Sequence, residues 1–145
     1  LITNGPGRPE HVPEIVETIK ALRGKVPMFG TGLGHQLIAL AFGAKIRKLA
    51  CGHHGSNHPV REIATGNMET FVQSHSYTVD SDSVEGTGLT VTHINVLDKT
   101  IEGLECAEEQ IFSVQFHPTN AEGPRGRICL IDKFVTMMKE AKTHA

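Results

Sequence analysis

The feature that most constrains this chain is a run of alternating glycines directly after a short apolar segment. Gly30-Thr31-Gly32-Leu33-Gly34 follows Val26-Pro27-Met28-Phe29. This layout is typical of a strand that turns sharply into a helix, the nucleophile elbow of covalent catalysts. The middle residue of such a turn carries the attacking atom. Because that residue is Gly32 here, the sequence predicts the scaffold of a covalent catalyst without its reacting atom.

Bulk composition is that of an ordinary globular domain and argues against several functions. The chain has 145 residues, and 14 Lys and Arg against 16 Asp and Glu give a formal charge of −2. No basic field is present to hold nucleic acid or an anionic membrane, and no apolar run approaches the ~18 residues of a membrane helix. Three cysteines without a CxxC pair favour a reducing cytoplasm over a disulfide framework.

Hydrophobic periodicity predicts an α/β fold. Apolar residues recur at helical spacing from Val12 to Leu22 and again from about Ile128 to Glu140, while Leu1 to Thr3 and Val26 to Phe29 suit strands. We expect an open, mostly parallel sheet flanked by helices, with an antiparallel extension in the second half. The strands expected there are Lys45–Leu49, Glu69–Gln73, Tyr77–Val79, Leu89–Val96, Thr100–Leu104 and Ile111–Phe116.

The chain is predicted to form one domain over residues 1–145, since no linker, repeat or low-complexity tract divides it. Its first residues, Leu1-Ile2-Thr3-Asn4, look like the end of a strand entering a turn, and there is no initiator Met. We therefore expect the domain to lack an N-terminal piece of its native protein.

Four segments resemble the class I, or triad, glutamine amidotransferases, and most closely the glutaminase domain of the carbamoyl-phosphate synthase small subunit. These segments are Phe29–Gln36, Gly52–Val60, Val91–Asn95 and Phe112–Pro118. The resemblance implies flavodoxin-like layering without the first strand and helix. It also implies that a cysteine thiolate attacks the side-chain amide of glutamine, that ammonia passes to a synthetase large subunit, and that no cofactor takes part.

The same resemblance assigns site residues. The nucleophile position falls on Gly32, the base on His117 and the acid on Thr119, so two of the three triad positions lack their group. Gly7 and Leu33 would supply the backbone N–H groups that hold the oxyanion. The pocket for glutamine, the candidate ligand, would be lined by Gly5, Gln36, Ser74, Ser76 and Tyr77.

Three functions remain open from the sequence. The leading one is a glutaminase domain that no longer hydrolyses glutamine, which would make it a pseudoenzyme. The second is an active hydrolase that uses an unrecognised nucleophile (Thr31, Cys51 and Cys129 are the options) or a water activated by His117. The third is an interaction module on the same scaffold. The pathway, pyrimidine or arginine supply, is not decided.

Two other motifs carry less weight. The glycine run is spaced G-x-G-x-G rather than G-x-G-x-x-G, which argues against a dinucleotide loop. Cys51, His53, His54 and His58 offer metal donors, but no second cluster completes a set. We expect no metal site here and interpret these histidines as structural, in a loop, with His35 as a tether of local backbone.

Overall fold

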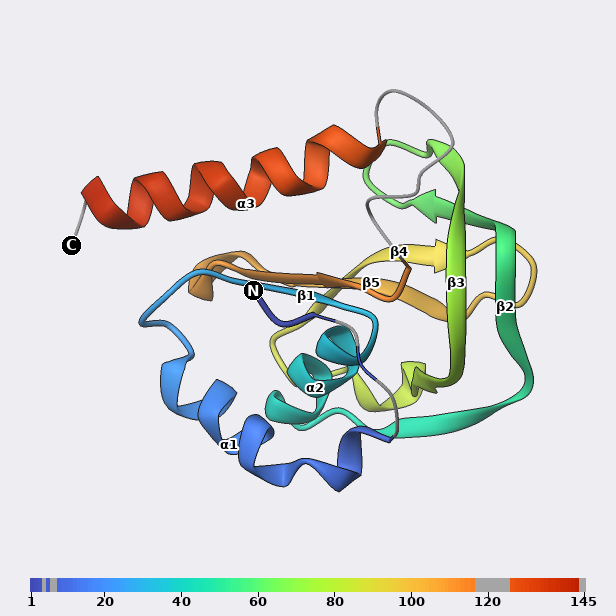
Figure 1. Ribbon diagram of the computed structural model, residues 1–145, viewed down its shortest axis with the longest axis horizontal. Coiled ribbons are helices and arrows are strands. Elements are labelled where there is room, and N and C mark those ends of the chain that lie inside the picture. The colour runs from blue at the N-terminus through green and yellow to red at the C-terminus, as the bar shows by residue number, and fades with distance from the viewer. Residues whose placement is uncertain (4, 6–7, 117–125, 144–145) are drawn as a thin grey trace.

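The computed structural model describes residues 1–3, 5, 8–116 and 126–143, which form one sheet with helices on both faces (Figure 1). The helices α1 (Pro13–Leu22) and α2 (Leu33–Ala41) lie on one face, and α3 (Gly126–Thr143) lies on the other. One group of buried residues joins α1 and α2 to the sheet. A second group joins Phe134 of α3 to Phe29 and Phe112.

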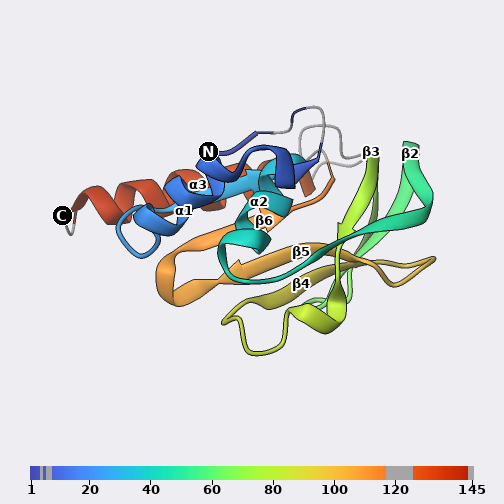
Figure 2. The same cartoon turned by 90° about the horizontal axis from the view of Figure 1, so that it is seen from below.

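The sheet has six strands in the order β1-β6-β5-β4-β2-β3, and β2 and β3 form a long pair at one end of it (Figure 2). Its strands are β1 (Met28–Thr31), β2 (Ile46–Glu62), β3 (Met68–Val79), β4 (Thr90–Asn95), β5 (Ile101–Cys106) and β6 (Ile111–Val114). Short 3-10 helices occupy Pro9–His11, Ser81–Ser83 and Ala107–Glu109.

The predicted α/β fold with a helix-flanked sheet is confirmed, but the sheet is mixed rather than mostly parallel. β1 pairs in parallel with β6, and Ile2 adds a parallel bridge to Gly30. The other four strand pairs are antiparallel. Short turns join β2 to β3, β4 to β5 and β5 to β6, and such turns produce antiparallel neighbours, whereas a parallel neighbour requires a longer crossover.

The loop expected around His53 is wrong, because this stretch lies inside β2. The β2–β3 pairing runs from Ile46 opposite Val79 to Arg61 opposite Met68. Two register shifts, between 48 and 53 and between 55 and 58, interrupt this pairing. The two strands expected at 69–73 and 77–79 are likewise one continuous strand, β3.

The first predicted helix forms, although its apolar stripe is only partly buried. Ile19 is buried, Val12 and Val16 pack against the same core, and Ile15 and Leu22 remain exposed. Nowhere in the described ranges does a helix combine the length and apolar character needed to cross a membrane.

Candidate functional site

The turn between β1 and α2 has the elbow geometry that the glycine run predicts. Gly32 adopts φ 57° and ψ −116°, a conformation that residues with a Cβ rarely take. Its N–H donates to the carbonyl of Val114 on β6 over 3.0 Å, and the N–H of Thr31 donates to the carbonyl of Ile2 over 2.9 Å. The apex is therefore fixed by backbone hydrogen bonds to its neighbours on both sides.

Gly30 and Gly34 are required for a different reason, which is close packing. A Cβ on Gly34 would lie 2.0 Å from the carbonyl oxygen of Ile2. A Cβ on Gly30 would lie 2.6 Å from Cδ1 of Ile38 and 2.8 Å from the Gly34 backbone. Gly30 and Gly34 thus let the segment around Ile2, β1 and α2 approach more closely than any side chain permits.

Of the two residues predicted to bind the oxyanion, the structure describes only Leu33. Leu33 is the first residue of α2, so its backbone lies at the positive end of the helix dipole, where a developing negative charge is stabilised. Gly5 lies next to it, since a Cβ built there would be 3.6 Å from Cδ2 of Leu33. Gly7, and with it one predicted N–H donor, lies outside the described residues.

Gln36 is buried inside the protein. Its amide nitrogen donates one hydrogen to the carbonyl of Tyr77 at 3.0 Å and the other to Oε1 of Gln115 at 2.9 Å. Both of its amide N–H groups are therefore used to fasten α2 to β3 and to the residue after β6. That Gln36 contacts a substrate stays a prediction. Its amide oxygen would have to make that contact.

The predicted substrate residues on β3 face two directions, because successive side chains of a strand alternate. Ser74 is exposed, with its hydroxyl 3.4 Å from Nδ1 of His54, and Ser76 is half-buried. The Tyr77 ring is covered by the guanidinium of Arg8, 5.0 Å from the ring centroid. Through Arg8 the N-terminal segment therefore contacts Tyr77, the residue of β3 whose carbonyl accepts a hydrogen bond from Gln36.

Of the triad positions, only Gly32 can be placed, because His117 and Thr119 lie outside the described residues. The other candidate nucleophiles receive no support: Cys51 is exposed on β2, and the hydroxyl-bearing Thr31 is buried in β1. The side chain of Cys129 is not described.

His35 contacts a side chain on β6 rather than the local backbone that the sequence analysis expected. Its Nδ1 lies 2.8 Å from the hydroxyl of Ser113 on β6, and the imidazole is fully buried. Burial lowers the pKa of His35 to about 3, with further lowering from His75 and His93. The neutral ring therefore serves to bind α2 to the sheet.

The sequence matches the family Glutamine amidotransferase class-I over residues 1–137. The chain belongs to this family. Among its relatives are carbamoyl phosphate synthase small chains of Halalkalibacterium halodurans and Listeria innocua, which are 53% and 48% identical over 100% of the chain. The chain spans only 40% and 41% of the length of these two relatives.

A solved structure supports the same fold. A Thermoplasma acidophilum protein named as part of a GMP synthase superimposes with a TM-score of 0.78, covering 97% of this chain and 72% of its own. At 18% sequence identity this likeness bears on the fold alone. This protein is thus a class-I glutamine amidotransferase domain similar to the carbamoyl phosphate synthase small subunit.

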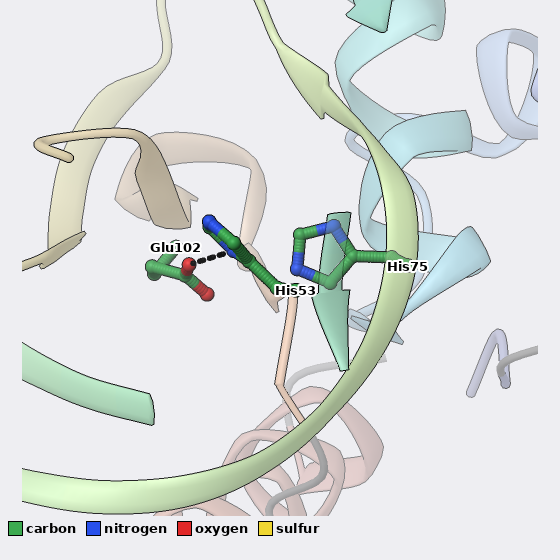
Figure 3. Close-up of side chains that lie close together, drawn as sticks. All are labelled: His53, His75 and Glu102. Carbon is green, nitrogen blue, oxygen red and sulfur yellow. Dashed lines mark ion pairs between the residues drawn. The ribbon is translucent and has the colours of Figure 1, made fainter. Parts of the chain in front are cut away.

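The amidotransferase domain also contains a polar cluster that the sequence did not predict, made of His53, Gln73, His75 and Glu102 (the histidine cluster). Figure 3 shows His53, His75 and Glu102. His53 lies between the other two titratable groups. Its Nδ1 is 3.5 Å from Oε1 of Glu102, and its ring centroid is 4.8 Å from that of His75. Of the nearby residues weighed as possible donors, His58 does lie beside His53, with ring centroids 5.1 Å apart, whereas His75 and Glu102 come from other strands.

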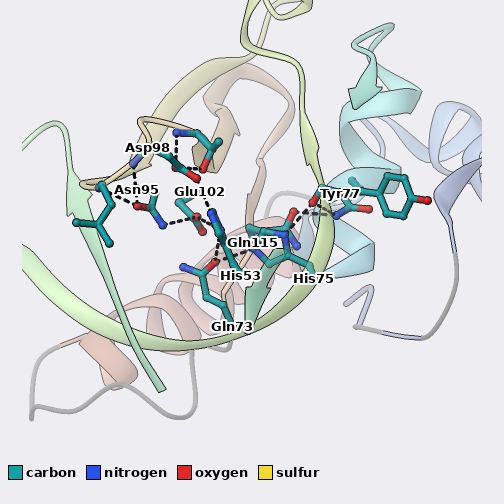
Figure 4. Close-up of polar contacts among 11 residues, drawn as sticks. His53, Gln73, His75, Tyr77, Asn95, Asp98, Glu102 and Gln115 are labelled. Atoms are coloured by element: carbon teal, nitrogen blue, oxygen red, sulfur yellow. Dashed lines mark hydrogen bonds and ion pairs between the residues drawn. The ribbon is translucent and has the colours of Figure 1, made fainter. Parts of the chain in front are cut away.

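Polar contacts connect the histidine cluster to the elbow helix (Figure 4). Oε1 of Gln73 lies 3.2 Å from Nδ1 of His53 and 2.7 Å from Nε2 of His75. Nδ1 of His75 donates to the carbonyl of Tyr77 at 2.8 Å, the same carbonyl that Gln36 binds. The two regions therefore share one backbone oxygen.

The electrostatics of this cluster are set by burial and by opposite charge. The hydrogen bond with Glu102 raises the pKa of His53 to about 9, assisted by Asp98 and opposed by burial. Burial raises the pKa of Glu102 and lowers the pKa of His75 to about 4. Gln73 and His75 lie two positions apart and so share one face of a strand, which was the sequence signal that could have located part of the cluster.

Proposed function

We propose that this chain is the glutaminase domain of a carbamoyl-phosphate synthase small subunit that holds glutamine without hydrolysing it. One observation carries the proposal: the apex of the elbow is Gly32, at φ 57° and ψ −116°. The backbone is shaped to present a nucleophile, and the residue has none. In enzymes with such a catalytic set, loss of the nucleophile alone costs on the order of 10⁶ in turnover.

The remaining parts of the proposed site fit ligand binding. The start of α2 at Leu33 provides a positive helix end, and Gly5 lies beside it. Gly7, His117 and Thr119 complete the proposed site on grounds of family resemblance. The proposed partner is a synthetase large subunit, and the proposed compartment is the cytoplasm, which agrees with the free thiols of Cys51 and Cys106.

Glutamate release from glutamine tests the proposal on three proteins. The unmodified chain should release no more than a Gly32→Ala/Thr119→Glu control, which has the strained apex and the acid but no thiol. Gly32→Cys/Thr119→Glu should exceed both by orders of magnitude. Turnover by the unmodified chain above the control would contradict the proposal and favour a hydrolase with another nucleophile. So would a covalent acyl adduct, detected by intact mass, on the unmodified chain.

Glutamine binding separates an impaired glutaminase from an interaction module. The chain has one Tyr and no Trp, so its tyrosine emission reports on Tyr77 alone. Glutamine should change this emission saturably and give a matching calorimetric signal, while asparagine, one methylene shorter, should give a weaker response. Absence of both signals would favour the interaction module.

A further inference from the structure

Side chains of types that bind metals come together from three strands, and the proposed glutaminase chemistry uses none of them. His53 comes from β2, His75 from β3 and Glu102 from β5, and one donor atom of each lies within 4.8 Å of the other two (Figure 3). We propose that the histidine cluster binds one divalent transition-metal ion, with zinc as the favoured ion. This inference does not depend on the proposed function.

Both imidazoles are held as metal-ligating histidines usually are. Nε2 of His53 lies 2.6 Å from Oδ2 of Asp98, and Nδ1 of His75 lies 2.8 Å from the carbonyl oxygen of Tyr77. Each acceptor fixes a proton on the outer nitrogen of its ring. The inner nitrogens, Nδ1 of His53 and Nε2 of His75, then face the centre of the cluster. A carboxylate or a backbone carbonyl behind each ring is the outer-shell arrangement typical of zinc sites.

Gln73 makes the centre of the cluster a place that needs a cation. Its Oε1 lies 3.2 Å from Nδ1 of His53 and 2.7 Å from Nε2 of His75. In the metal-free chain, a proton on Nδ1 of His53 supplies positive charge between Oε1 of Gln73 and Oε1 of Glu102. A metal ion that replaces this proton supplies that charge and converts both inner ring nitrogens and Oε1 of Gln73 into ligands.

Glu102 supplies the fourth ligand and the negative charge. The side chain is fully buried, and its Oε2 has no hydrogen-bond partner among the described residues. A buried carboxylate oxygen without a partner is costly, and coordination would satisfy it. Its Oε1 already lies 3.5 Å from Nδ1 of His53.

The spacing and the donor types favour zinc. Zinc bonds of about 2.0–2.1 Å to nitrogen and oxygen place tetrahedral ligands roughly 3.3 Å apart. Three of the donor separations in the cluster are 2.7, 3.2 and 3.5 Å, and the donors of His53, His75 and Glu102 all lie within 4.8 Å of one another. Two imidazoles with two oxygens suit zinc and its neighbours in the first transition row, whereas Mg²⁺ and Ca²⁺ prefer oxygen alone. Because the donors are buried, the ion would join β2, β3 and β5 as a structural centre.

Metal titration of the folded chain tests the site directly. The protein carries Cys51→Ser to remove an exposed thiol and is first treated with a chelator. Zn²⁺ should bind at one ion per chain by calorimetry and raise Tm by about 5–10 °C at a hundredfold excess over Kd. Mg²⁺ should do neither. Co²⁺ should give the visible d–d bands of a tetrahedral site without thiolate charge transfer. Absence of the Co²⁺ bands and of the Tm shift would overturn the proposal and leave the cluster as a hydrogen-bond network.

Variants identify the ligands. His75→Gln and Glu102→Gln should each weaken Zn²⁺ binding by more than about 100-fold, and Asp98→Asn, behind His53, by about 10–100-fold. His54→Gln, an exposed histidine next to His53, is the matched control and should leave binding unchanged. Binding that survives the first two substitutions but is lost in the control would assign the ion to the surface and overturn the site. If a variant does not fold, the Co²⁺ spectrum of the parent protein decides the matter.

Discussion

The elbow and the histidine cluster meet at the carbonyl of Tyr77, yet they are built on opposite principles. The elbow is made by the absence of side chains: Gly30 and Gly34 permit close approach, and Gly32 permits the turn. The histidine cluster is made by polar side chains that contact one another in a largely buried place, where Oε2 of Glu102 and Nε2 of Gln73 have no partner among the described residues. Backbone geometry for a reaction can therefore persist where the reacting group is missing. A polar cluster, by contrast, depends on each of its members.

The largest effect is expected where the elbow is packed most tightly. Gly34→Ala places a Cβ 2.0 Å from the carbonyl oxygen of Ile2, so α2 or the segment around Ile2 must move. We expect a loss of about 3 kcal/mol in the free energy of unfolding, measured with urea. Gly5→Ala is the control, because its Cβ would meet only Cδ2 of Leu33, at 3.6 Å. Equal losses for the two variants would show that close approach does not hold the elbow together.

The next effect tests the histidine cluster in the presence of a chelator. His53→Gln removes the hydrogen bond to Asp98 and the counter-charge of buried Glu102. We expect a loss of about 2 kcal/mol in the free energy of unfolding. His54→Gln, on the same strand but exposed, should cost less than about 0.5 kcal/mol. Equal losses in the free energy of unfolding for His53→Gln and His54→Gln would show that the members of the cluster do not depend on one another.

A pH-dependent effect tests His35, a buried histidine next to the elbow. The pKa of His35 is about 3 in the folded chain, below its usual 6.5, so the unfolded chain takes up the proton first. Stability from the neutral ring is therefore lost as pH falls from about 6.5 towards 3, by roughly 1.4 kcal/mol per pH unit.

His35→Asn keeps a polar atom near Ser113 and removes this titration. Urea unfolding from pH 7 to pH 4 should show the variant gaining on the parent protein as pH falls. A cavity alone would lower stability equally at every pH, so a constant difference between the two proteins would contradict the assignment of His35 as a neutral buried tether.

The features that could be predicted from the sequence are those set by residues close together in the chain. The elbow follows from three glycines within five positions, and α1 follows from one helical stripe. The histidine cluster joins residues on β2, β3 and β5, and β2 and β3 align only through two register shifts. Nothing within a short window specifies such pairing. The family resemblance predicted a loop around His53, whereas the structure places it in a strand whose partner, β3, is aligned through those shifts.

The smallest effect concerns the segment that covers Tyr77. The guanidinium of Arg8 lies 5.0 Å from the Tyr77 ring centroid and is exposed, beside Glu10 at 3.5 Å. A cation over a ring at such a site contributes about 0.5–1 kcal/mol, so Arg8→Gln should lower stability by no more than that. Tyrosine emission is the sharper measurement, because Tyr77 is the only tyrosine and there is no tryptophan. Arg8→Gln should change this emission, while Lys20→Gln, an exposed control on α1, should not. Unchanged emission in Arg8→Gln would mean that the N-terminal segment does not rest on β3, and that the elbow and the histidine cluster meet only through the Tyr77 carbonyl.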